Sequence, residues 1–171
     1  MGTHDMNQFA RRHPFSGFLL FLLSFIIAIG LSVFPLSSSF SPYWPLWIVL
    51  VLIFWTVHLP MLIKPWMVWC LGIFIDVLFG GWLGVHALAF IIVYFFALKM
   101  SSAIKAFQFL SQMGRMLLLL SLYQMTLYLL QANSWLDILW FFPPIITSLI
   151  IWPCVFSILR HWAGKFYIHY L

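Results

Sequence analysis

The sequence predicts an all-α integral membrane protein with six transmembrane helices and both termini in the cytoplasm. The first observation is composition. Hydrophobic residues make up 65% of the 171 residues and charged residues 6%, against roughly 45–50% and about 25% in soluble globular domains. A soluble domain of this length could not bury so much apolar surface, whereas a bilayer can solvate it. The other two observations are that the apolar residues form six segments and that the basic residues are distributed asymmetrically between them.

Six apolar segments predict the helices in chain order. They cover residues 15–34, 44–62, 66–79, 85–98, 116–131 and 138–159. The first is too long for the core of a signal peptide and lacks a small-residue cleavage site, so we expect it to be retained. No polar stretch is long enough for a second domain. The sequence therefore predicts a cytoplasmic N-terminal segment (1–14), one membrane domain (15–160) and a cytoplasmic tail (161–171).

The third and fourth segments are short. About 15 residues of helix span roughly 22 Å, less than the hydrocarbon core of about 30 Å. Either these helices extend through residues 60–65 and the GGWLG turn, or the hairpin turns within the membrane. Irregular backbone at that depth must be shielded by protein or face water, so we expect the hairpin to lie inside the protein.

Prolines and a tryptophan define the sixth segment. Pro143 and Pro144 fit the first turn of a helix, where a missing N–H group costs nothing. Pro153, which follows Trp152, falls in the interior of the same segment. An interior proline leaves one carbonyl unpaired, here that of Leu149, and bends a helix. Trp152 and Pro153 therefore predict a helix bend.

The basic residues predict the orientation. All 8 Lys and Arg fall on one side if the N-terminus is cytoplasmic and the chain crosses six times. They are Arg11, Arg12, Lys64, Lys99, Lys105, Arg115, Arg160 and Lys165. Cytoplasmic loops carry such an excess of Lys and Arg. The net charge of +5 therefore indicates topology and not nucleic-acid binding.

The connector 99–115 between the fourth and fifth segments has an amphipathic pattern. Its polar residues Lys105, Gln108, Gln112 and Arg115 recur at helical spacing, with apolar residues on much of the opposite side. This predicts a short helix on the cytoplasmic face. Two interpretations stay open: a docking surface for a cytoplasmic partner, or an interfacial connector without a partner.

Asp76 lies within the otherwise apolar stretch GIFIDVLFGGWLGVHALAF. A carboxylate near the middle of a bilayer costs about 2.5–3.5 kcal/mol on insertion scales. Gly72, Asp76 and Gly80 are spaced four residues apart, so they fall close to one helix face and favour close approach of another helix. The partner of Asp76 could be His86, a backbone group or another protein. Its role could be structural or directed at a partner or ligand.

Signatures of catalysis and metal binding are absent from the sequence. It contains no serine-centred glycine motif, no HExxH, no paired intramembrane aspartates and no phosphate-binding loop. Cys70 and Cys154 both fall in apolar segments, which favours packing over disulfide or metal roles. We therefore predict no enzymatic activity, no cofactor and no metal site. A transporter stays possible, because such proteins use acids near the membrane centre and broken helices.

The residues resemble those of a known family. The segments PYWPLWIVLVLIFWTVHLP and GIFIDVLFGGWLGVHALAFIIVYFFALK are similar to the rod-shape-determining protein MreD family of bacteria. The shared features, spread over roughly residues 15 to 165, are Phe54-Trp55, Pro60, Gly72, Asp76, Gly80, Gly84, Tyr94 and Trp152-Pro153. No role is carried over for His86.

The resemblance implies a non-enzymatic scaffold in the bacterial inner membrane. Such a protein would bind the membrane protein MreC and link MreB filaments to the glycosyltransferase and transpeptidase that synthesise the cell wall. The family is also similar in fold to the S components of energy-coupling-factor transporters. That likeness implies an alternative: a transporter-like protein that binds a small ligand, with Asp76 in a pocket open to the outer side.

Overall fold

The computed structural model describes the backbone of residues 14–33, 43–58, 60, 63–101, 109–131 and 141–168, and in those ranges it contains helices and no strand. The helices are α2 (Pro14–Val33), α3 (Trp47–His58), α4 (Pro65–Phe79), α5 (Val85–Lys99), α7 (Phe109–Gln131) and α8 (Phe142–Ile168). The predicted all-helical fold is confirmed for this part of the chain.

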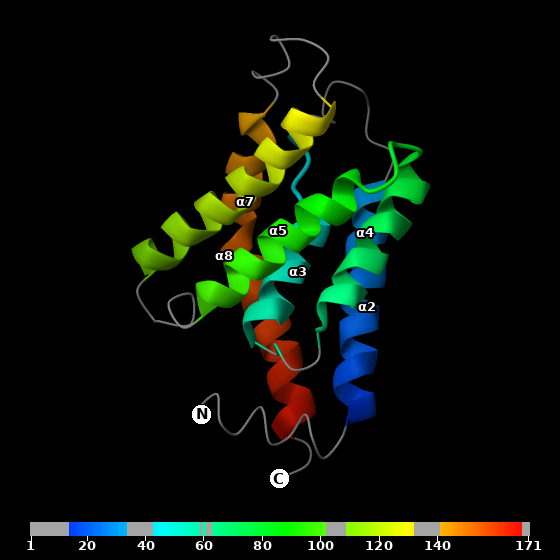
Figure 1. Ribbon diagram of the computed structural model, residues 1–171. Coiled ribbons are helices and arrows are strands. Elements are labelled where there is room, and N and C mark those ends of the chain that lie inside the picture. Colours follow the sequence, from blue (N-terminus) through cyan, green and yellow to red (C-terminus); the bar gives the residue numbers. More distant parts are fainter. Residues whose placement is uncertain are drawn as a thin grey trace.

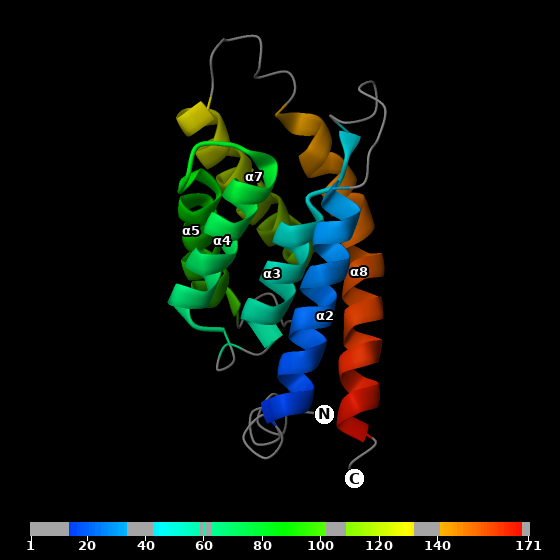
Figure 2. The same cartoon turned by 90° about the vertical axis from the view of Figure 1, so that its right-hand side faces the viewer.

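The helices run back and forth between two ends of a bundle (Figures 1 and 2). The hairpin end contains the turn between Phe79 and Val85. The basic end contains Lys64, which precedes α4, and Lys99, which ends α5. α2 and α8 lie together on one side of α3, while α5, α4 and α7 lie on the other (Figure 2).

The centre of the bundle is α3. Its residues 48–57 are all buried, which is expected of a helix that is apolar on every side. It packs against α2, α5 and α8. Two hydrogen bonds fix it: the Trp55 indole donates to the Ser24 hydroxyl at 2.8 Å, and the Leu46 amide, just before α3, donates to the Ser148 hydroxyl at 2.8 Å.

The two helices of the hairpin differ in their surroundings. α5 contacts α3, α4 and α7, whereas α4 packs mainly against α5. Large apolar side chains on the opposite face of α4 are exposed, among them Trp66, Trp69, Phe74 and Val77. The expectation that the whole hairpin lies inside the protein is therefore wrong for α4. Among the described residues, α4 is buried along one face, mainly against α5.

The helix ends agree with the sequence-based expectation where glycine or proline marks them. α4 and α5 each have 15 residues and lie within one residue of the predicted segments. Pro143 and Pro144 fall in the first turn of α8, and Pro153 lies in its interior. α8 continues to Ile168, well into the predicted tail.

The expected connector 99–115 differs from the structure at its C-terminal end. α7 begins at Phe109 and runs without a break to Gln131. Residues 109–115 therefore continue into a long helix, because no proline interrupts the sequence there. Gln112 and Arg115 lie on α7, while Lys105 and Gln108 lie outside the described residues.

Two helical stretches have the length and composition needed to cross a membrane. They are Gln112–Gln131 in α7 and Phe142–Trp162 in α8. The other apolar helical stretches whose side chains the structure describes are shorter: Leu19–Val33, Trp47–His58, Pro65–Phe79 and Val85–Lys99. Six membrane crossings and cytoplasmic termini therefore stay predictions.

Candidate functional site

The turn between α4 and α5 is built on two glycines in the left-handed backbone region. Gly80 has φ of 66° and ends α4, and Gly84 has φ of 97° and precedes α5. Only glycine adopts these conformations without strain. The backbone carbonyl of Asp76 accepts hydrogen bonds from the amides of Gly80 and Gly81, which caps α4.

Gly72 is the point of closest approach between the two helices. A Cβ atom added there would lie 2.2 Å from the Cα of Ala87, 2.6 Å from its amide nitrogen and 2.9 Å from its Cβ. The backbones of α4 and α5 therefore touch directly, as in the small-residue seams that join membrane helices. No residue larger than glycine fits at position 72 unless the helices separate.

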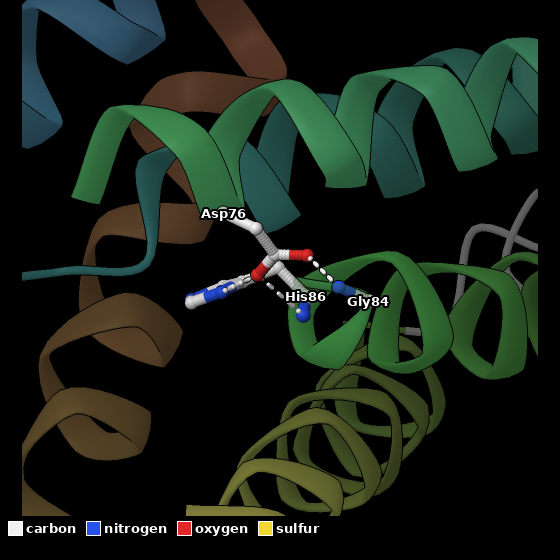
Figure 3. Close-up of polar contacts among 3 residues, drawn as sticks. All are labelled: Asp76, Gly84 and His86. Atoms are coloured by element: carbon white, nitrogen blue, oxygen red, sulfur yellow. Dashed lines mark hydrogen bonds and ion pairs between the residues drawn. The ribbon is translucent and has the colours of Figure 1, made fainter. Parts of the chain in front are cut away.

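Asp76 lies one turn beyond Gly72 and points across the seam at the start of α5 (Figure 3). One carboxylate oxygen, Oδ2, accepts a hydrogen bond from the Gly84 amide at 2.7 Å. The other, Oδ1, accepts from the His86 amide at 3.0 Å and pairs with His86 Nδ1 at 2.7 Å. The Asp76 side chain is completely buried.

In this arrangement the side chain of Asp76 caps the start of the following helix, whose N-cap residue is Gly84. The amide of Gly84, just before α5, and the amide of His86 in its first turn would otherwise lack a partner, because helix N-termini leave their N–H groups free. A carboxylate satisfies them and interacts favourably with the positive end of the helix dipole. One side chain on α4 thus fixes where α5 begins and how it is oriented.

His86 completes the cluster. A carboxylate only accepts hydrogen bonds, so Nδ1 of His86 carries the shared proton, and in the neutral ring Nε2 is left as an acceptor. The ring stacks beside Phe79 with centroids 6.2 Å apart and lies against Phe90 and Tyr123. We refer to Gly72, Asp76, Gly84, His86 and Ala87 as the hairpin site.

The chemistry available at the hairpin site is hydrogen bonding within the protein. Both oxygens of Asp76 are paired, and no solvent reaches them. In the described ranges, no group of three or more His, Cys, Asp or Glu residues could hold a metal ion. The geometry favours a structural role for the acid.

The structure separates other residues that the sequence placed together. Gly80 was expected on the packing face with Gly72 and Asp76, but it is exposed and serves to end α4. Trp152 is buried in α8 against Phe156, and Pro153 follows it, partly buried. Gln112 and Arg115 are partly buried on α7, away from the hairpin site.

Sequence reasoning missed Ala87 and the interactions of Tyr94. Ala87 is the backbone contact of Gly72, but an alanine within an apolar helix carries no distinctive signal. The hydroxyl group of Tyr94, buried on α5, donates to the carbonyl of Ile63 at 2.9 Å. A tyrosine in an apolar segment does signal a buried hydrogen bond, because its hydroxyl group needs a partner.

Comparisons with known proteins identify the family. The family model described as rod shape-determining protein MreD matches residues 13–162. A rod shape-determining protein MreD of Haemophilus influenzae is 26% identical over 151 residues, which cover 85% of this chain and 91% of that protein. No solved structure matches. The family match spans most of the chain and includes the whole hairpin site, so the protein belongs to the MreD family of rod shape-determining proteins.

Proposed function

We propose that this protein is a non-enzymatic, multi-pass scaffold of the bacterial inner membrane that binds MreC and links MreB filaments to the peptidoglycan synthases. Membership of a rod shape-determining family supports a role in cell shape. The observation that best supports the scaffold role is the set of interactions that Asp76 makes. This buried acid caps a helix and is unavailable to a substrate.

The exposed face of α4 is our candidate surface for the membrane partner. α4 packs mainly against α5, which leaves Trp69, Phe74 and Val77 uncovered. A single transmembrane helix of a partner could pack there, since membrane helices associate through close side-chain packing. The hairpin site holds this face in place because it fixes α4 to α5.

The basic residues at one end of the bundle support the proposal that this end faces the cytoplasm and contacts filament proteins. Lys64 and Lys99 are exposed at this end, and Arg160 lies on the part of α8 that leads to it. Positively charged residues accumulate on the cytoplasmic side of membrane proteins. We therefore place the basic end in the cytoplasm.

The alternative function, a transporter with Asp76 in an open pocket, has less support. The cavity next to the hairpin is lined by His86, and Asp76 does not contribute to it. A carboxylate with both oxygens paired and no exposure does not offer a site for a transported ligand.

Co-purification with MreC from membranes tests the scaffold role. We expect wild-type protein to capture MreC, and we expect the double substitution Phe74→Ala with Val77→Ala to reduce capture at least fivefold. The matched control is Ile146→Ala with Ile150→Ala, which removes similarly exposed side chains from α8. A well-folded wild-type protein that never captures MreC would contradict the proposal. Equal loss in both variants would contradict the assignment to α4.

A further inference from the structure

The exposed side of α8 carries an apolar strip whose length matches an ordinary bilayer. Its exposed members recur at four-residue spacing along the helix: Phe142, Ile146, Ile150, Cys154, Ile158 and Trp162. At 1.5 Å per residue, the helix between the aromatic residues at the two ends of the strip is about 30 Å long. The hydrocarbon core of a typical bilayer is also about 30 Å thick.

The corresponding strip on α4 is shorter. Its exposed apolar side chains begin at Trp66, directly after Lys64 and Pro65, and end at Phe79, where Gly80 stops the helix. The helix from Trp66 to Gly80 is about 21 Å long, and α5 has the same number of residues as α4. Both views show α2 and α8 extending beyond α4 at the basic end (Figures 1 and 2). The two sides of the bundle therefore differ in apolar length by about 9 Å.

The tip of the hairpin, residues Gly80, Gly81, Trp82 and Leu83, has the properties of a segment at the headgroup level. Trp82 is 82% exposed and Leu83 is 72% exposed, and both glycines are exposed as well. Irregular backbone is not tolerated against lipid within the hydrocarbon, whereas an exposed tryptophan favours the headgroup zone. The tip is therefore expected to reach the surface of the hydrocarbon.

The other end of the hairpin is held at the opposite surface. Lys64 precedes α4 and Lys99 ends α5, and both side chains are exposed. A shift of the hairpin that lifted its tip toward the far headgroups would draw both lysines into the hydrocarbon, where a charge is costly. Tilting does not help, because it reduces the thickness that the hairpin spans. The bilayer beside the hairpin therefore has to adapt to the protein.

We propose that the α4–α5 side of the protein binds a bilayer that is locally about 9 Å thinner than the bilayer beside α8. A short hydrophobic stretch is accommodated by thinning of the bilayer, by extension of flanking side chains or by oligomerisation. The described tip contains no long charged side chain that could extend to water. The partner of this surface is phospholipid whose two headgroup layers approach each other along α4 and α5. This inference rests on the multi-pass arrangement proposed above and does not depend on MreC binding.

Depth measurements on the spin-labelled, full-length protein test the proposal. Cys70 and Cys154, which are both exposed, are first replaced by alanine. Single nitroxide labels are then attached to cysteines that replace exposed residues of the hairpin: Trp66, Phe74 and Trp82. The protein is placed without MreC in dioleoyl phosphatidylcholine nanodiscs that hold one copy, which excludes oligomerisation. Power saturation in electron paramagnetic resonance, with oxygen and a nickel chelate, gives the depth of each label.

The matched control uses labels at Phe142→Cys and Trp162→Cys, the two exposed ends of the α8 strip. We expect these labels and the labels at positions 66 and 82 to lie at the headgroup level. We expect the label at position 74 to lie deep in the hydrocarbon, which shows that the hairpin crosses the bilayer. Because positions 66 and 82 are closer together along the membrane normal than the α8 positions, this pattern means a thinner bilayer beside the hairpin.

Two results would overturn the proposal, and they have different consequences. A label at position 66 or 82 that lies deep in the hydrocarbon, with both α8 labels at the headgroups, shows a bilayer of ordinary thickness beside the hairpin. That result leaves the multi-pass scaffold intact. A label at position 74 as shallow as those at positions 66 and 82 shows that the hairpin does not cross the bilayer, which contradicts the multi-pass arrangement as well.

Discussion

The hairpin site and the neighbouring cavity share His86 and lie at the same end of the bundle, yet they treat buried polar groups in opposite ways. In the hairpin site, both oxygens of Asp76 are hydrogen-bonded. Trp47 and Gln124 line the cavity, and their buried atoms Nε1 and Oε1 have no hydrogen-bond partner. The comparison separates polar residues that stabilise the fold through hydrogen bonds from polar atoms that make none. It predicts that changes in the hairpin site reduce stability, whereas removal of an unpaired polar group beside the cavity has little effect on stability.

Asp76→Ala is the largest expected effect. It leaves the Gly84 amide, the His86 amide and the His86 imidazole without their acceptor. At about 1 kcal/mol or more for each unpaired buried donor, we expect a loss of about 3 kcal/mol. Thermal unfolding in detergent, followed by loss of the monodisperse peak in size-exclusion chromatography, measures it. Wild-type thermal stability in this variant would contradict the structural role of the acid.

Gly72→Ala follows, because a single methyl group would overlap the backbone of Ala87. Such overpacking costs about 1–3 kcal/mol, and we expect the upper part of that range because the contact is with backbone. The matched control is Gly30→Ala on α2, where an added Cβ meets nothing within 4 Å. Replacing a helical glycine at an open position stabilises by up to about 1 kcal/mol. A decrease in stability for Gly72→Ala together with no decrease for Gly30→Ala confirms the close contact between α4 and α5. An equal change in stability in the two variants contradicts it.

Gly84→Ala should have a smaller effect. The φ of 97° at Gly84 strains any residue that has a side chain, although no atom lies within 4 Å of an added Cβ. Backbone strain of this kind costs of order 1–3 kcal/mol, and we expect about 1 kcal/mol because the space is open. The same melting experiment measures it. A loss as large as that of Asp76→Ala would mean that the conformation of the turn, and not the carboxylate, dominates the hairpin.

Gln124→Met is the smallest expected change in stability. It removes an acceptor that has no partner, so no hydrogen bond is lost. Replacing an unpaired buried polar group by an apolar one of similar shape is close to neutral or stabilising. We therefore expect the melting temperature to stay the same or rise slightly. A clear decrease in it would show that Gln124 is a structural residue and would remove the contrast between the cavity and the hairpin site.

Much of the hairpin could be predicted from the sequence because its features are local. Pro65, Gly80 and Gly84 mark the ends of α4 and α5, and the spacing of Gly72 and Asp76 places both on the packing face. The start of α7 at Phe109 could not be predicted, since no glycine or proline marks it.

The cavity could not be predicted for a related reason. Ser32, Trp47 and Gln124 are far apart in the sequence, and only the crossing of α2, α3 and α7 brings them together. An apolar segment that contains one glutamine or one serine gives no indication of which neighbour it will face. The exposure of α4 was also missed, because a short apolar segment looks the same whether it faces protein or lipid.

Asp76→Asn tests the central claim most directly, because it removes the charge and keeps a hydrogen-bonding side chain of the same size. If Asp76 stabilises the hairpin, the asparagine keeps some of the hydrogen bonds to α5, and the variant melts at a lower temperature than wild type. It still restores rod shape to cells that lack the native protein. The measurement is cell shape at matched membrane levels, together with thermal stability of the purified variant. Spherical cells that contain an Asp76→Asn protein as abundant and as stable as wild type would show that the charge itself acts in function, and would contradict the account.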